Sequence, residues 1–224
     1  MVKTNIVPLT KEEMDKLIDA SIEDQFFHML FTVAKTTGRR LGEYYGSQKK
    51  KEIARYIVDY KPGYDSEGNQ ISIGITRVKY KKLPEWEGGV KVKDINFEKG
   101  IMKVWILKKR KLVQDESVLT PEASRLLRSY IIGNKLQPED YVFRKLGYRQ
   151  IQNKVKYYAK KAKINHNVSM HNFRHYLISE LIRMGWSHSK ISKITGQSPN
   201  VIPIYDHVLP SEIKEDALRD LKEI

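Results

Sequence analysis

Apolar side chains recur at helical spacing along most of the chain and predict a mainly helical protein. In the clearest case they lie three and four residues apart and stop at Gly38, a residue type that commonly ends helices. These apolar positions are Phe26, Phe27, Leu30, Phe31 and Ala34. Upstream, Thr10 and Glu13 have the spacing of a capping box, which predicts a helix to about Ala20. Further helices are predicted over residues 39–45, 121–132, 148–163, 170–184, 187–195 and 211–223.

The pattern changes between residues 46 and 119, where it predicts β structure. Within the least regular stretch, 46–88, it predicts a charged helix over 49–58, turns over 61–70 and an alternating strand over 71–80. The predictions for the next stretch are strands at 90–92, 101–108 and 117–119, a tight turn at 98–100 and a long charged hairpin tip at 109–116. The expected fold is therefore mainly α with a small antiparallel β-sheet, an α+β class.

The charge balance suits a polyanionic partner. Lysine and arginine number 41 against 27 aspartates and glutamates, which gives a net charge of +14 and an isoelectric point near 9.6. A domain with a pI above about 9 and clustered cations has the electrostatic footprint of nucleic-acid binding. The clusters lie at residues 49–51, 79–82, 108–111 and 154–163. The alternative interpretation is a lysine-rich, solvated surface of the kind found in heat-adapted proteins.

Composition also excludes several classes of protein. The chain has no cysteine, so disulfides and cysteine-ligated metals are impossible. No apolar run reaches the roughly 18–20 residues that a bilayer requires, and the charged start lacks the apolar core of a signal peptide. These features predict a cytoplasmic protein without a membrane partner and without redox chemistry.

The strongest local motif is His171-Asn172-Phe173-Arg174-His175. His171 and Arg174 lie three residues apart on a predicted helix and therefore share a face. Such a pair suits a phosphate, because a guanidinium grips two oxygens while an imidazole adds a hydrogen bond. A metal site of His171 and His175 is the rival interpretation, although Asn172 stands where a metalloprotease has its glutamate. An ordinary helix with a capping histidine and a surface arginine is the third.

Further segments stand in a fixed order around this motif. Gly185 and Gly196 lie 11 and 22 residues after Arg174, and Gln197 follows directly. The segment Ile204-Tyr205-Asp206-His207-Val208 comes next. Upstream, Thr37-Gly38-Arg39-Arg40-Leu41-Gly42-Glu43 opens a helix just after a buried one. Each segment alone is a weak signal, but their order along the chain is specific.

In this order the segments resemble the tyrosine recombinases. That family carries a TGLRxxE-like segment, a lysine on a β-hairpin, an HxxR motif, a glycine followed by histidine or tryptophan, and a tyrosine within an IYxH-like segment. The resemblance covers about residues 7–222 and is interrupted by residues 46–88, which look like an insertion. It implies the catalytic-domain fold of the family, with residues 1–224 as one catalytic domain and without the N-terminal DNA-clamping domain that members usually carry.

The resemblance assigns a catalytic site residue by residue. Arg40 matches the first catalytic arginine, because Gly38 and Glu43 fix the register, whereas Arg39 stands at a position that is usually apolar. Gln197 occupies the histidine or tryptophan position, and the step from it to the matched tyrosine is one residue shorter than expected. The remaining matches are His171 and Arg174 for HxxR, Tyr205 for the nucleophile, and Lys108 for the hairpin lysine, with Lys109 and Lys111 as competitors.

The resemblance also implies the chemistry. Tyr205 would attack a DNA phosphate and leave a 3′-phosphotyrosyl link with a free 5′-hydroxyl, so that rejoining needs no ATP, metal or cofactor. Arg40 and Arg174 would neutralise the charge that spreads over the non-bridging oxygens. Lys108 would protonate the leaving oxygen, and His171 would assist proton transfer near the tyrosine.

Roles are also expected for Gln197, as a further catalytic residue, and for Glu43 and His175. Gln197 can donate a hydrogen bond but cannot shuttle a proton, so reduced rather than absent activity is expected. Glu43 is expected to orient the His171 side of the site through hydrogen bonds, unless it is simply a carboxylate on a helix surface. His175 is expected to be structural.

Double-stranded DNA is the partner that these features predict. The basic helix over 148–163 resembles the DNA-facing helices of the family, although a solvated helix face would have the same composition. The candidate DNA-contacting residues are Lys109, Arg110, Lys111, Tyr148, Arg149, Gln152 and Lys156. The last helix, 211–223, either packs on its own domain or docks on a neighbouring protomer in a tetrameric synapse.

The function predicted from the sequence is that of a site-specific recombinase or integrase of a mobile genetic element. Two alternatives remain: a DNA-relaxing enzyme like the type IB topoisomerases, and a DNA-binding protein whose active site has decayed. In its lack of cysteine and its Lys-, Ile- and Tyr-rich composition the chain resembles archaeal and archaeal-virus integrases.

Overall fold

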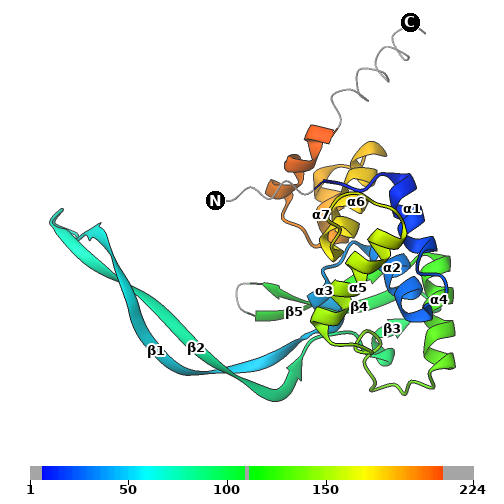
Figure 1. Ribbon diagram of the computed structural model, residues 1–224, viewed down its shortest axis with the longest axis horizontal. Coiled ribbons are helices and arrows are strands. Elements are labelled where there is room, and N and C mark those ends of the chain that lie inside the picture. The colour runs from blue at the N-terminus through cyan, green and yellow to red at the C-terminus, as the bar shows by residue number, and fades with distance from the viewer. Residues whose placement is uncertain (1–6, 109–110, 209–224) are drawn as a thin grey trace, which may run out of the picture. The chain divides into compact units, whose positions relative to one another are not determined.

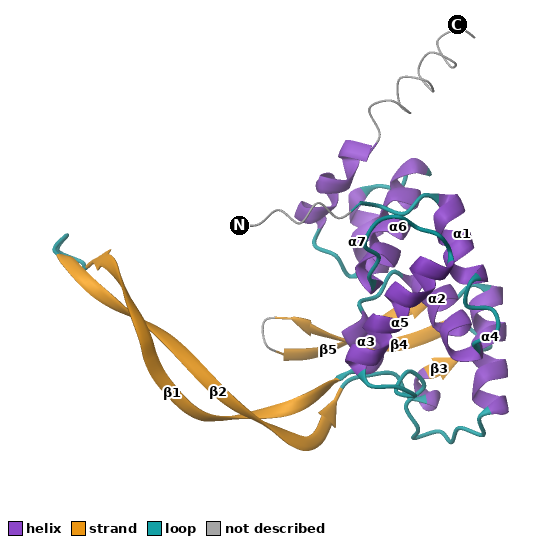
Figure 2. Cartoon of the chain, in the orientation of Figure 1, coloured by secondary structure: helices purple, strands orange, loops and turns teal. Residues whose placement is uncertain are grey.

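The computed structural model describes residues 7–108 and 111–208 and divides the chain into two compact units (Figures 1 and 2). The first unit holds the residues before Gly46 and after Glu87, and the second is Gly46–Glu87. The helix expected over 211–223 lies outside the described residues. Within the part of the chain that is described, no helix has the length and apolar character needed to cross a membrane.

The core of the first unit forms around α2 (Gln25–Thr37), because most of the side chains of this helix are apolar and buried. Its rings pack on aromatic side chains of two later helices, α5 (Tyr148–Lys161) and α6 (Met170–Arg183). The ring centroid of Phe31 lies 5.1 Å from that of Phe173 and 5.7 Å from that of Tyr158. Burial of each such side chain stabilises the fold by roughly 1.5–3 kcal/mol.

The remaining helices begin where the sequence signals their first turn. Thr10 and Glu13 form the predicted capping box, and Thr120 caps a helix whose first residue is Pro121. The remaining helices are α1 (Lys11–Asp19), α3 (Leu41–Tyr45), α4 (Pro121–Gly133), α7 (His188–Thr195) and the 3₁₀ helices η1 (Val92–Asp94) and η2 (Pro199–Val208). Together with α2, α5 and α6 they confirm the prediction of a mainly helical fold.

A three-stranded antiparallel sheet in the order β3-β4-β5 lies in the same unit. Its strands are β3 (Ile95–Asn96), β4 (Ile101–Lys108) and β5 (Lys111–Val118). The strand predicted at 90–92 is wrong, since that segment forms a single bridge from Lys91 to Tyr141 and then turns into η1. The hairpin tip predicted at 109–116 is also wrong, because residues from Lys111 onwards pair with β4. Their polar side chains lie on a solvated strand, which composition does not separate from a loop.

The second unit is an antiparallel hairpin of β1 (Ser47–Tyr64) and β2 (Gln70–Glu87). The helix predicted over 49–58 is therefore wrong. The aromatic and β-branched run Tyr56–Val58 favours a strand, and pairing with β2 outweighs the helical tendency of the charged residues before it. Asp65 closes the turn, because its Oδ1 accepts hydrogen bonds from the backbone amides of Glu67 and Asn69, each at 2.9 Å.

Within the first unit, hydrogen bonds fix the residues that flank the segment Gly46–Glu87 in the sequence. The amide of Val90 donates to the carbonyl oxygen of Tyr44 at 2.8 Å, and the Nε of Arg144 donates to the carbonyl oxygen of Tyr45 at 2.7 Å. Gly89 has φ +83, and a Cβ at this position would lie 2.7 Å from the Tyr45 carbonyl oxygen. Only glycine allows this close approach.

Candidate active site

Four of the predicted site residues converge at helix ends in the first unit. Gly38 and Gly196 end α2 and α7 in the left-handed conformation, with φ of 58 and 67, and so redirect the chain just before a site residue. The four are Arg40 after α2, His171 and Arg174 on α6, and Gln197 after α7.

Arg174 is the most deeply buried of these residues, at 3% exposure. Its Nη1 donates to the carbonyl oxygens of Gly38 at 2.9 Å and Thr195 at 2.7 Å. Carbonyls at the C-terminal end of a helix lack helical partners, and their partial negative charge favours a cation. The guanidinium therefore fixes the ends of α2 and α7, and its Nε and Nη2 remain directed at the site.

A single oxygen, Oε1 of Gln197, accepts hydrogen bonds from both site arginines. Arg174 donates from Nε at 3.1 Å and from Nη2 at 2.6 Å, and Arg40 donates from Nη2 at 3.0 Å. Guanidinium groups are well suited to holding the oxygens of phosphates and carboxylates through several N–H donors. The amide oxygen of Gln197 thus marks the place where an anionic oxygen would bind.

Glu43 holds Arg40 in position. Its Oε1 accepts from Nη1 of Arg40 at 3.1 Å, and its Oε2 accepts from the Arg40 backbone amide at 3.3 Å. The Glu43 side chain is only 8% exposed, and a buried carboxylate needs a counter-charge, which Arg40 supplies. The hydrogen bonds of Glu43 go to Arg40, which lies beside His171, and its role in orienting the His171 side of the site stays a prediction.

His171 lies in the first turn of α6 beside the two arginines. Partial burial lowers the pKa of its imidazole, and the positive charges of Arg40 and Arg174 lower it further. The ring is therefore neutral near pH 7, so it can accept a proton. Among the described residues, no group of three or more His, Asp or Glu side chains could hold a metal ion. The rival interpretation, a metal site of His171 and His175, therefore gains no support.

Arg39, next to Arg40, has a different role. Its side chain is fully buried, and its three donor nitrogens bind residues of β5. Nε donates to Oγ of Ser117 at 2.7 Å, Nη1 to Oδ2 of Asp115 at 2.8 Å, and Nη2 to the carbonyl oxygen of Glu116 at 2.6 Å. Arg39 therefore joins the end of α2 to the sheet and is closed to a substrate. Sequence reasoning missed this network, although a charge at a usually apolar position was a signal.

Replacing Arg39 with alanine is expected to lower the free energy of unfolding by about 3 kcal/mol, because the partly buried Asp115 loses its counter-charge. Urea denaturation measures this change. The matched control is Arg125→Ala on α4, an exposed arginine whose removal is expected to change stability by no more than about 0.5 kcal/mol. Equal effects of the two substitutions would contradict the structural role of Arg39.

His175, one turn along α6, makes stability depend on pH. Burial first, and then the charges of His171 and Arg174, lower its pKa from the ordinary 6.5 to about 4. The unfolded chain therefore binds a proton that the folded chain does not, so stability falls as the pH drops from 6.5 towards 4. We expect the thermal midpoint of the wild type to fall more steeply between pH 7 and 5 than that of His175→Gln. Parallel profiles would exclude His175 as the cause.

The segment that carries the predicted nucleophile is anchored to the site helices. η2 packs against α6 and α7, and its Ile202 is fully buried in a cluster with Ile178 and Ile191. Tyr205 follows Ile202 by three residues in the same 3₁₀ helix. The structure describes the backbone of Tyr205 but not its side chain. Its assignment as the nucleophile therefore stays a prediction.

The hairpin lysine is left open in the same way. Lys108 ends β4 and pairs across the hairpin with Lys111, and neither side chain is described. Lys109 and Arg110 lie outside the described residues altogether. The choice among these basic residues for the general acid and for DNA contacts stays a prediction.

The candidate DNA-contacting residues of α5 are exposed. Arg149, Gln152 and Lys156 lie at helical spacing on one face, and Tyr148 is 40% exposed. The ring of Tyr148 meets that of Tyr45 edge to face, with centroids 5.5 Å apart. This face is accessible to a ligand, and its contacts with DNA stay a prediction.

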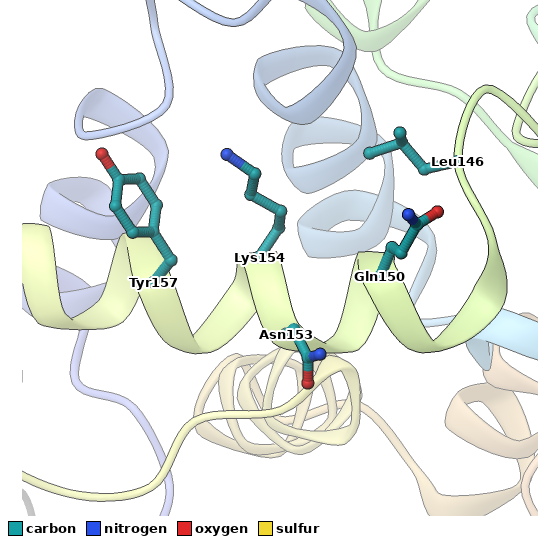
Figure 3. A pocket seen from close by; sticks show the side chains of 5 residues that line it. All are labelled: Leu146, Gln150, Asn153, Lys154 and Tyr157. Atoms are coloured by element: carbon teal, nitrogen blue, oxygen red, sulfur yellow. The ribbon is translucent and has the colours of Figure 1, made fainter.

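A pocket of about 360 Å³ lies elsewhere on α5 (Figure 3). Gln150, Lys154 and Tyr157 extend from one side of the helix in that view, and the ammonium of Lys154 lies 4.8 Å from the centroid of the Tyr157 ring. The lining residues are Leu146, Gln150, Asn153, Lys154 and Tyr157. The pocket contains none of the predicted catalytic residues and is separate from the site.

Residues 88–212 match the phage integrase family. XerA recombinase is similar in structure with a TM-score of 0.67 and 21% identity, over 96% of this chain and 65% of that one. A post-cleavage complex of XerH site-specific recombinase with a palindromic difH substrate gives 0.63 and 17%, over 94% and 52%. A lambda integrase dimer bound to a COC' core site gives 0.52 and 13%, over 88% and 58%.

The structural similarities show a shared fold, and the chain spans about half to two thirds of the length of these proteins. No curated protein matches the sequence. None of the similarities supports the archaeal-virus origin suggested by composition. The matched segment covers more than half of the chain and includes His171, Arg174, Gln197 and Tyr205. The chain therefore belongs to the phage integrase family, the tyrosine recombinases, and carries the catalytic-domain fold of that family.

Proposed function

We propose that the chain is a site-specific DNA recombinase, or integrase, that cleaves and rejoins duplex DNA through a 3′-phosphotyrosyl intermediate, without a metal ion, ATP or a cofactor. The phenolic oxygen of Tyr205 forms a bond to phosphorus while the bond from phosphorus to the 5′-oxygen breaks. The leaving oxygen takes a proton from Lys108. Attack by the free 5′-hydroxyl reverses the reaction and releases the tyrosine, and the ester bond is conserved throughout.

One observation carries this proposal: two guanidinium groups, one from Arg174 on α6 and one from Arg40 just before α3, meet at one oxygen position. Arg40 and Arg174 both donate to Oε1 of Gln197, and a non-bridging phosphate oxygen in that place would receive the same donors. Glu43 and two helix-end carbonyls already fix the arginines, so only the neutral amide of Gln197 has to move when the phosphate binds, and the donors are in place as charge develops on it. Electrostatic preorganisation of this kind is often the largest single contribution to catalysis.

The environment of the site also favours proton transfer from the tyrosine. A free phenol has a pKa of about 10, so it needs help to ionise near neutrality. The charges of Arg40 and Arg174 favour the phenolate. The imidazole of His171, kept neutral by burial and by the same charges, can accept the proton.

The partner in this proposal is double-stranded DNA, which the net charge of +14 suits. XerH recombinase and lambda integrase were both crystallised on DNA, the latter as a dimer. We extend this to the present chain as a DNA-associated cytoplasmic enzyme. It would assemble into a tetrameric synapse through residues 211–223, with residues 46–88 as an insertion in its catalytic domain.

Incubation with supercoiled plasmid in EDTA, without ATP, tests the proposal without knowledge of a target site. The expected products are relaxed plasmid and a protein–DNA adduct that resists SDS. Tyr205→Phe is expected to abolish both. Tyr157→Phe, which alters a tyrosine 55% exposed on α5, is the matched control and is expected to leave both unchanged.

The outcomes also separate the alternatives. Adduct formation together with strand exchange between two duplexes supports the recombinase. Relaxation without strand exchange favours an enzyme like the type IB topoisomerases. Salt-sensitive DNA binding with no adduct favours a DNA-binding protein with a decayed site, and activity that survives Tyr205→Phe places the nucleophile elsewhere.

A further inference from the structure

The hairpin Gly46–Glu87 exposes a face with an ordered pattern of side chains. Alternate residues of a strand share a face, so every second residue of β2 points the same way. From the turn towards the open end of the hairpin, this face carries three isoleucines and then three cations. They are Ile71, Ile73, Ile75, Arg77, Lys79 and Lys81, and all six are exposed.

The cations of this row are not neutralised within the protein. Glu52 pairs with Arg55 at 3.0 Å and Glu85 with Lys49 at 2.8 Å, so these two carboxylates serve other cations. Asp59, opposite Ile75 in the register, accepts the backbone amide of Tyr60. Across the described part of the chain, no ion pair involves Arg77, Lys79 or Lys81. The row therefore presents three available positive charges.

A two-stranded ribbon buries too little apolar surface to be stable alone, so a partner that covers this face would stabilise it. Because the row carries three positive charges, the partner that fits it best is a polyanion. The DNA major groove, about 12 Å wide, admits a two-stranded ribbon. At about 3.3 Å per residue the row from Ile71 to Lys81 is roughly 33 Å long, so it can follow a groove over several base pairs.

We propose that the hairpin Gly46–Glu87 is a second DNA-binding module of this protein. Arg77, Lys79 and Lys81 contact phosphates along a groove of the duplex. Ile71, Ile73 and Ile75 lie in the groove, where apolar side chains contact thymine methyl groups. The inference rests on the proposed function only in taking duplex DNA as the partner, and it does not require the chain to cleave DNA.

The test is the salt dependence of binding to a 40-base-pair duplex of random sequence, measured by fluorescence anisotropy with the full chain. Each phosphate contact contributes about 0.9 to the slope of log K against log salt concentration, so Arg77→Gln/Lys79→Gln/Lys81→Gln is expected to reduce that slope by about 2.7. The matched control Lys16→Gln/Lys91→Gln/Lys93→Gln removes the same charge from lysines that pair with carboxylates, and is expected to reduce it by less than about 1.

Circular dichroism melting checks that the variants fold, and Lys79→Gln alone, with an expected slope change of about 0.9, replaces the triple variant if that one does not. Equal slopes for the two triple variants, or no binding by the wild type, overturn the proposal. Loss of self-association in sedimentation with an unchanged slope also overturns it, because the face would then contact a second copy. The adduct assay is independent: a wild type that forms no adduct but shows the slope change removes the recombinase function and leaves the DNA-binding hairpin.

Discussion

Replacing Arg40 with alanine is expected to lower the rate of adduct formation by about 10³-fold, the effect typical of removing a preorganised arginine from a phosphoryl-transfer site. Arg40 supplies one of the two guanidinium groups that meet at the oxygen position marked by Gln197. Without it, the charge on one side of the phosphate would not be neutralised. The initial rate of SDS-resistant adduct from supercoiled plasmid measures the effect.

A second substitution separates this loss from a loss of folding. Arg40→Ala also removes the counter-charge of Glu43, which is 8% exposed, so part of its effect could come from instability. Arg40→Lys keeps that charge but loses the planar fork that reaches two acceptors at once. We expect the free energy of unfolding of Arg40→Lys to lie within about 1 kcal/mol of that of the wild type. Its rate of adduct formation is still expected to fall by about 10²-fold. A fully active Arg40→Lys would contradict the role given to the guanidinium.

The second large effect is expected from Gln197→Glu. A carboxylate at this position would form ion pairs with both Arg40 and Arg174, which adds a full negative charge to the acceptor of hydrogen bonds that the neutral amide oxygen accepts in the wild type. It would occupy the anion position and compete with phosphate, whereas the neutral amide can be displaced. We expect adduct formation to fall by at least about 10²-fold while stability is kept or raised. Plasmid cleavage and urea denaturation measure the two quantities.

Two further variants at this position serve as controls. Gln197→Ala empties the position without adding charge and is expected to lose less activity than Gln197→Glu. Gln197→His supplies a residue that the family carries there and is expected to be at least as active as the wild type. If Gln197→Glu and Gln197→Ala lose activity equally, the phosphate oxygen does not bind at the position that Oε1 of Gln197 occupies.

The sequence predicts most of the helical fold because local signals and burial agree there. The apolar spacing that ends at Gly38 gives α2, and Thr120 with Pro121 gives the start of α4. In the site, the register between Gly38 and Glu43 selects Arg40 over Arg39, and the structure places Arg40 beside Arg174 and Gln197. Here the residues lie close to helix ends, where a helix-ending residue such as Gly38 gives a local signal.

What the sequence does not predict depends on pairing between distant residues. The charged start of β1 has a helical tendency, and only its partner strand makes it extended. The network of Arg39 joins residues 76 to 78 positions apart, so no local pattern contains it. The same holds for Gln197. The sequence predicts that its side chain donates a hydrogen bond, whereas in the structure its oxygen accepts one from Arg40, 157 positions away.

The most direct test of the proposed chemistry is to identify the residue that becomes linked to DNA. The wild-type protein is incubated with supercoiled plasmid in EDTA, the adduct is isolated in SDS and digested with protease and nuclease, and the modified peptide is sequenced by mass spectrometry. We predict a nucleotide attached through its 3′-phosphate to Tyr205, with a 5′-hydroxyl on the other DNA end. A link to any other residue, or to a 5′-phosphate, would contradict the mechanism.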